Sequence, residues 1–164
     1  MFDAFIKIDG IPGESTDDKH KDWIEVLSYS TGLSQTATAT KSSAGGASSE
    51  RADFQEFSIV KALDKASPLL ALQCANGTAI KSVILELCRA GGDKVKYMEY
   101  KLTNCMITSD RLGGSAQGSE NLPLEEVSFD YGKIEWNYVQ QKREDGAGGG
   151  NVAAGWDLQK NVKV

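Results

Sequence analysis

The residues of this chain that suggest chemistry most directly surround its only histidine. His20 lies in the run Asp17-Asp-Lys-His-Lys-Asp22, where an imidazole among carboxylates could bind a metal ion or transfer protons. Two lysines interrupt this run, and it lacks the central glycine and terminal glutamate of a calcium loop. Charged runs usually face water. We therefore predict a solvated loop over residues 15–22 and no metal site.

Other signatures of enzymes are equally weak. Residues 148–153 formally fit Gly-x-Gly-x-x-Ala, but the dinucleotide motif needs a strand before it and a helix after it. A polar segment precedes this run, so residues 146–150 are interpreted as a flexible spacer. Glu125 and Glu126 are neighbours on a strand and must point to opposite faces, so they cannot work as an acid–base pair. The sequence predicts no catalytic residue, cofactor or metal.

Composition narrows the class of protein further. The chain has 164 residues, 40% of them hydrophobic and 25% charged, which suits one globular domain. Its net charge is -5, which argues against nucleic acid and against an anionic membrane surface. The N-terminus lacks the basic and apolar regions of a signal peptide, and no apolar run approaches the ~20 residues of a membrane span. The three cysteines show no metal-binding or redox spacing, which favours buried free thiols: Cys74, Cys88 and Cys105.

The elements that must position these residues are mainly strands. Residues 122–139 alternate strictly between two unlike faces, which is typical of a long strand. Similar alternation or turn-bounded apolar runs predict further strands over residues 2–9, 22–33, 54–60, 79–89, 94–109 and 156–164. Gly91-Gly-Asp93 predicts a hairpin between two of them. We expect a mainly β fold, an antiparallel two-sheet β-barrel with one short flanking α-helix.

That helix is predicted within residues 64–77. Ser67 can cap its first turn, Pro68 suits the first helical position, and Gly77 can adopt the left-handed conformation that ends a helix. Because the helix is short, tertiary packing must hold it, and we expect that packing to involve three leucines: Leu69, Leu70 and Leu72.

One long loop stands out by its composition. Residues 36–52 are almost free of large side chains, so they cannot bury enough apolar surface to offset their ordering entropy. Loops of this length in compact domains are usually functional or disordered. We expect a long mobile loop over residues 41–50.

Several segments together resemble the haemolysin-coregulated protein (Hcp) family, the tube protein of the bacterial type VI secretion system. The matching pieces occur in the family's order and cover nearly the whole chain. They are Phe5-Ile-Lys-Ile-Asp-Gly10, Gly13-Glu-Ser-Thr-Asp-Asp-Lys-His-Lys21, Ile24-Glu-Val-Leu-Ser-Tyr29, Asp64-Lys-Ala-Ser-Pro68, Cys74-Ala-Asn-Gly77, Leu112-Gly-Gly-Ser115, Leu122-Pro-Leu-Glu-Glu-Val127 and Gly155-Trp-Asp157.

The resemblance implies a structural role and no enzymatic activity. It implies a hexameric ring with an open channel, stacked into a tube that a contractile sheath surrounds and a spike trimer caps. Expected partners are therefore other copies of the chain, sheath and spike proteins, and small effector proteins held in the lumen. The protein would be made in the bacterial cytoplasm and then secreted without a signal peptide. An alternative is a dedicated effector carrier or chaperone without a role in the tube.

The resemblance also indicates where contacts would lie. One tube domain would span residues 1–164, with residues 38–51 as an inter-ring loop and residues 140–164 as a C-terminal extension too short for a toxic domain. Candidate inter-ring residues are Lys41, Ser42, Ser43, Glu50 and Arg51, and candidate lumen residues are Ser30 and Ser115.

Overall fold

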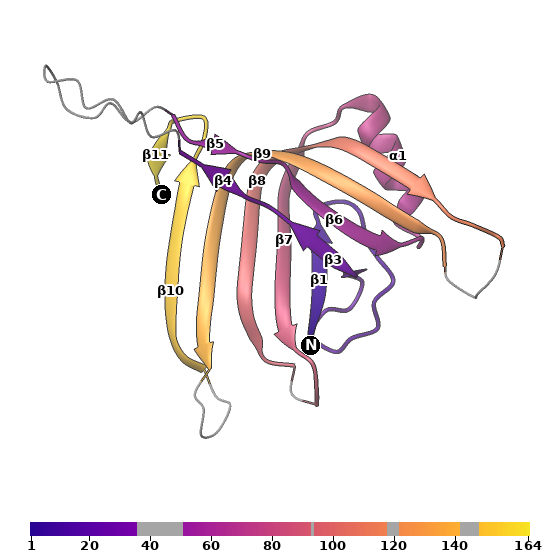
Figure 1. Cartoon of the computed structure of the whole chain (residues 1–164), viewed down its shortest axis with the longest axis horizontal. Helices are drawn as coiled ribbons and strands as arrows, with labels where there is room; N and C mark the ends of the chain where they lie inside the picture. The colour runs from indigo at the N-terminus through magenta and orange to yellow at the C-terminus, as the bar shows by residue number, and fades with distance from the viewer. Residues whose placement is uncertain (36–50, 93, 118–121, 142–147) are drawn as a thin grey trace, which may run out of the picture.

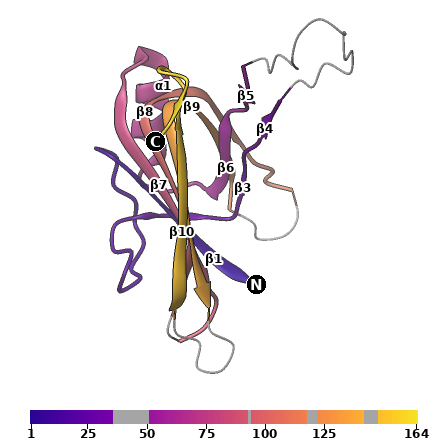
Figure 2. The same ribbon diagram turned by 90° about the vertical axis from the view of Figure 1, so that its left-hand side faces the viewer.

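The fold is mainly β with one short helix, as predicted (Figure 1). A computed structural model describes residues 1–35, 51–92, 94–117, 122–141 and 148–164. Nine strands form one antiparallel sheet: β1 (Phe2–Ile8), β2 (Ile24–Val26), β3 (Ser28–Ser30), β6 (Phe57–Ala62), β7 (Ile80–Arg89), β8 (Lys96–Gly113), β9 (Leu124–Gln141), β10 (Gly148–Asp157) and β11 (Val162–Lys163). A separate pair, β4 (Leu33–Ser34) and β5 (Asp53–Phe54), leads away from the barrel (Figure 2).

Strand β9 organises this sheet because it pairs with three other strands. Along one edge it pairs with β8 over nearly its whole length. Along its other edge, residues 124–129 pair with β6, and residues 133–141 pair with β10. The strand order β11-β10-β9-β8-β7-β1-β2 therefore has a branch at β9, through which β6 and β3 form a second layer. Because only Leu27 separates β2 from β3, the chain joins the two layers into a barrel.

The barrel interior is filled by the alternate residues of its strands. In β6, Phe57 and Ile59 are fully buried, and in β9 the buried partners are Val127 and Phe129. The register places Phe57 opposite Phe129 and Ile59 opposite Val127, so these side chains form cross-strand pairs. The hydroxyl of Tyr131 donates a hydrogen bond of 2.8 Å to the Gln55 carbonyl, which satisfies this buried phenol.

The helix α1 (Ser67–Asn76) differs from the prediction at its start and in its packing. Ala66 occupies the N-cap position without any side-chain cap, and Ser67 is the first helical residue. Gly77 ends the helix at φ 65°, as predicted. Leu70 is fully buried, but Leu69 and Leu72 are 39% and 54% exposed. Packing by all three leucines was therefore a wrong prediction, because only one of them faces the sheet.

The C-terminal segment is also more ordered than its glycines indicated. Gly148–Gly150, predicted as part of a flexible spacer, begins β10 and pairs with the end of β9. The ladder then runs in register to Asp157 opposite Lys133. The spacer prediction was wrong here because a long neighbouring strand supplies the hydrogen bonds that local composition does not. Residues 146 and 147 lie outside the described residues.

Among the described residues, no helix combines the length and apolar character needed to cross a membrane. Within that part of the chain, the only helix is the ten-residue α1.

Candidate functional site

His20 does not lie in a solvated loop, as we predicted, but in the protein interior. Its side chain is only 2% exposed, and its ring stacks on Phe5 with the centroids 4.3 Å apart. Just before the loop that carries His20, the chain passes so close to Trp23 that a Cβ on Gly13 would collide with the Trp23 carbonyl. The prediction was wrong because the loop packs onto β1 and β7. The contact between His20 and Glu86 joins residues 66 positions apart, so it leaves no local pattern in the sequence.

The buried imidazole is the centre of an ion network. Its Nδ1 lies 2.7 Å from Asp17 Oδ2 and its Nε2 lies 2.7 Å from Glu86 Oε2. Both ring nitrogens thus face carboxylate oxygens, which hold the ring from two sides. Lys94 Nζ adds a hydrogen bond of 2.6 Å to Asp17 and holds the pKa of that carboxyl at about 2. Lys96 Nζ lies 3.7 Å from Glu86.

A thiol completes this cluster, but its state argues against catalysis. Cys88 Sγ lies 3.9 Å from His20 Nε2, and His20, Glu86 and Cys88 have potential ligand atoms within 4.8 Å of one another. Burial, reinforced by the Glu86 carboxylate, raises the pKa of Cys88 to about 11, so the thiol stays protonated. His20 and Glu86 already share a direct hydrogen bond, and Cys88 is fully buried. The arrangement therefore suits a structural clamp better than a nucleophile or metal centre.

A second buried ion network fastens the start of α1 to the barrel. Lys61, which is fully buried in β6, places its Nζ 2.7 Å from Glu125 Oε1 and 2.8 Å from Asp64 Oδ1. The Ser67 hydroxyl, 3.2 Å from Lys61 Nζ, donates to Glu125 Oε1 at 2.9 Å. The Ser67 hydroxyl therefore bonds the ion pair and accepts a hydrogen bond of 3.1 Å from the Asp64 amide, which precedes the helix. Glu125 is buried and Glu126 is exposed, so the predicted opposite orientation of these two residues is confirmed.

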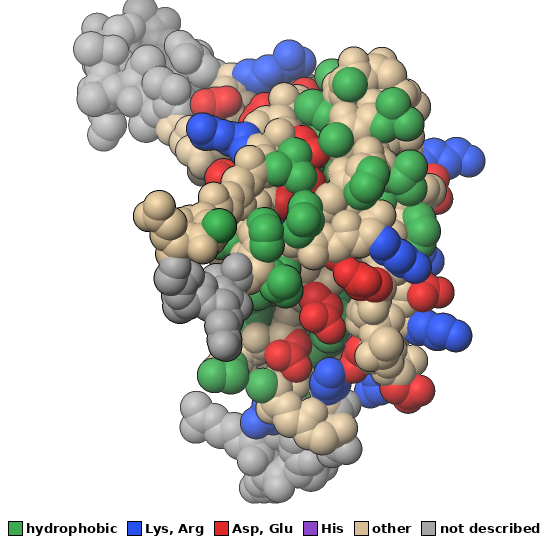
Figure 3. Space-filling model, turned by 90° about the vertical axis from the view of Figure 1, so that its right-hand side faces the viewer, with side chains coloured by type: hydrophobic (Ala, Val, Ile, Leu, Met, Phe, Trp, Pro, Cys, Tyr) green, Lys and Arg blue, Asp and Glu red, His purple; other side chains and the backbone are tan. Residues whose placement is uncertain are grey.

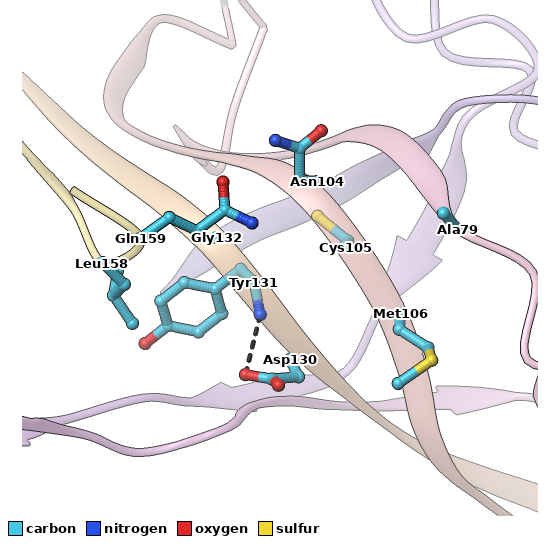
Figure 4. A pocket seen from close by; sticks show the side chains of 9 residues that line it. All are labelled: Ala79, Asn104, Cys105, Met106, Asp130, Tyr131, Gly132, Leu158 and Gln159. Atoms are coloured by element: carbon cyan, nitrogen blue, oxygen red, sulfur yellow. Dashed lines mark hydrogen bonds between the residues drawn. The ribbon is translucent and has the colours of Figure 1, made fainter.

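A cavity of about 580 Å³ opens near the point where β9 changes partners (Figure 4). Asn104 adopts the left-handed conformation at φ 55° there, and a Cβ on Gly132 would lie 3.3 Å from the Asn104 Cβ. The amides of Asn104 and Gln159 are the main polar groups, and Asp130 supplies one carboxylate. This lining can offer hydrogen bonds to a ligand, but it does not form an acid–base pair. The lining residues are Ala79, Asn104, Cys105, Met106, Asp130, Tyr131, Gly132, Leu158 and Gln159.

Two surfaces on different sides of the molecule offer groups that a partner could contact: a strand edge and a set of exposed leucines. On one side, β10 pairs with β9, and among the described residues its other edge is covered only at its end, by β11 at Trp156 and Asp157 and by the Val164 amide at Gly155. Val152 on this strand is 71% exposed. On the side that Figure 3 shows, hydrophobic side chains gather on the surface. The exposed leucines of α1 and of the adjoining ends of β6, β8 and β9 are Leu63, Leu69, Leu72, Leu112 and Leu124, here called the leucine group.

The predicted site residues fall into two sets. Lys41, Ser42, Ser43 and Glu50 lie outside the described residues, and Arg51 is an exposed residue just before β5. Both lumen candidates are exposed: Ser30 ends β3 opposite Ser58, and Ser115 follows β8. Their roles remain predictions. Of the thiols, Cys88 and Cys105 are buried and free, as expected, whereas Cys74 is half-buried.

The fold and the structural character of its buried networks agree with the matches to known proteins. A family profile described as "Type VI secretion system effector, Hcp" matches residues 5–138. The chain is 33% identical to Protein hcp1 of Pseudomonas aeruginosa, over 99% of this chain and 98% of that protein. The chain therefore belongs to the Hcp family of type VI secretion system proteins.

Solved structures agree with this assignment. The structure described as that of a type six secretion system protein matches with a TM-score of 0.92 and 36% identity, covering all of both chains. Hcp1 from Salmonella typhimurium matches with a TM-score of 0.81 and 31% identity over 99% of both chains. A type VI secretion system effector from Yersinia pestis matches with a TM-score of 0.75 and 33% identity, over 94% of this chain and 99% of that one.

If His20 acts as a structural clamp, removing its ring nitrogens should destabilise the fold. His20→Phe keeps an aromatic ring against Phe5 but removes both nitrogens, leaving the Asp17 and Glu86 carboxylates without this partner. We expect the free energy of unfolding to fall by about 3 kcal/mol, as for other buried ion pairs that lose one member. Chemical denaturation measures this. Lys21→Gln, at an exposed position in the same loop, is the control and should change little. Equal stability of both variants would refute the clamp.

Proposed function

We propose that this chain is the structural subunit of the type VI secretion inner tube, forming hexameric rings that stack and are expelled by sheath contraction. The observation that carries the proposal is membership of the Hcp family along nearly the whole chain. A mechanical role is also supported by His20 and Lys61, two buried side chains whose contacts with carboxylates join distant segments of the fold.

Ring formation is supported by the strand edge and the set of exposed leucines. An open strand edge exposes unpaired backbone groups, and exposed apolar side chains lose contact with water when a partner covers them. The β10 edge and the leucine group belong to different strands, so one copy can use one surface while its neighbour uses the other. Head-to-tail contacts of this kind form a closed ring when the rotation between neighbours completes a circle.

Stacking of rings is proposed to involve the loop over residues 38–51. The strands β4 and β5, which flank this segment in the sequence, form a pair that leads away from the barrel (Figure 2). Lys41, Ser42, Ser43, Glu50 and Arg51 are the proposed contact residues in it. Leu33 in β4 is exposed and would add an apolar contact at the base.

The stacking role predicts a selective defect. Replacing residues 41–50 with a short turn should leave rings intact and reduce the number of stacked rings, because the segment has almost no large side chains that a core could use. Electron microscopy of the purified variant beside the parental protein measures both. Stacks of unchanged length would contradict the role of the loop.

Carriage of small effectors in the lumen is the second part of the proposal. Ser30 and Ser115 are small, polar and exposed, which suits positions that leave room for a guest protein. The expected partners beyond the chain itself are sheath proteins, a spike trimer and such effectors. A carrier without a tube role remains the alternative, and it predicts effector binding without export of the ring.

Export driven by the sheath tests the proposed function. Cells with a working sheath should release the full-mass protein into the medium, whereas sheath-deficient cells should retain it. Mass spectrometry of culture supernatants, corrected with a cytoplasmic marker for lysis, gives the comparison. Equal extracellular amounts in both strains would contradict the tube role.

A further inference from the structure

Two carboxyl groups meet in the barrel beneath α1 without enough donors to satisfy them. The β8–β9 register pairs Asp110 with Val127 and Leu112 with Glu125, so Asp110 and Glu125 are diagonal neighbours on one face of the sheet. Both strands thus direct a carboxyl group to the same part of the barrel. Yet three of their oxygens, Asp110 Oδ1, Asp110 Oδ2 and Glu125 Oε2, are buried without a donor among the described residues.

The nearby cation is already shared. Lys61 Nζ lies 2.7 Å from Glu125 Oε1 and 2.8 Å from Asp64 Oδ1. The charged groups at this corner are thus one ammonium from β6 and three carboxyls, from β8, β9 and the turn before α1; the helix contributes only the neutral Ser67 hydroxyl. The adjacent Arg111 is exposed, and strand alternation directs it to the other face.

Two neighbouring buried carboxyl groups that lack other donors can satisfy each other only if one of them is protonated, because two carboxylates have no donor. We propose that Asp110 and Glu125 share a single proton in the folded chain, carried by Asp110 and donated to Glu125 Oε2. This corner is then a proton-dependent latch that holds α1 and β6 to the β8–β9 pair. The latch is a property of the single chain and does not depend on the tube role.

The charges around the pair agree with this assignment of the proton. Burial, followed by the interaction with the Glu125 carboxylate, raises the pKa of Asp110 to about 7. Burial alone would raise the pKa of Glu125 too, but hydrogen bonds from Asp110, Lys61 and Ser67 outweigh it and lower that pKa. Glu125 is therefore the charged member of the pair and Asp110 the protonated one.

The sign of the pH dependence follows from the raised pKa of Asp110. In the unfolded chain this group loses its proton near its ordinary pKa of 3.8, whereas the folded chain keeps it until about pH 7. The contribution of the latch to stability is full below the ordinary pKa and is lost as pH rises to about 7. Above that pH, a second negative charge stands beside Glu125 without a cation of its own, and the corner loosens.

Asp110→Asn provides the test, because an amide donates to Glu125 Oε2 without needing a proton. Unfolding of the full chain is measured from about pH 5 to pH 9. Relative to Asp110→Asn, the folded-to-unfolded ratio of the parental protein should fall with rising pH by up to about tenfold per pH unit, and level off above the Asp110 pKa. Glu126→Gln removes an exposed neighbouring carboxyl and should retain the parental dependence.

If Asp110→Asn fails to fold, the protonation state of Asp110 can be measured directly in the parental protein. Carboxyl ¹³C NMR of the labelled chain should show Asp110 still protonated at pH values where exposed aspartates have ionised. Parallel pH profiles of the parental protein and Asp110→Asn would overturn the proposal. Titration of Asp110 near its ordinary pKa would overturn it as well.

Discussion

Strand β9 cannot pair with β6 and β10 along the same stretch of its edge, and most of the architecture depends on that constraint. Residues 124–129 pair with β6, whereas residues 133–141 pair with β10. The sheet must therefore divide near residues 130–132, where Gly132 lacks a side chain and Asn104 adopts the left-handed conformation. One branch closes the barrel over its core, and the other extends as β10 with an open edge. Closure of the subunit and the open edge of β10 thus have the same origin.

The two buried ion networks determine how the remaining segments attach to this frame. His20 binds the loop of residues 15–22 to β7, and Lys61 binds the start of α1 to β9. Removing one member of such a network leaves a charge buried without its partner, which makes detachment of the segment costly. In the tube role proposed above, segments fastened in this way would keep the subunit intact under load. The proposed proton between Asp110 and Glu125 would make part of this second attachment depend on pH.

The sequence predicted most of the long strands, the end of the helix and the fold class because period-two alternation and a glycine stop are local signals. Its resemblance to a family supplied the architecture as a whole. His20 and the partners of Glu125 were missed because charge runs indicate solvent unless distant carboxylates or amines are brought to them. Leu69 and Leu72 misled the helix prediction because an apolar residue does not reveal whether it faces its own core or a partner's surface. The β10 strand was hidden by its glycines, since pairing with β9 outweighs local propensity.

Native mass spectrometry of the purified chain tests the central claim that this protein is a ring-forming subunit. The account predicts a dominant species of six times the 17.7 kDa chain mass at micromolar concentration. Disrupting the β10 edge with a proline at Val152, which is exposed and unpaired on its outer side, should convert that species to smaller ones. A parental protein that remains entirely monomeric under these conditions would contradict the account.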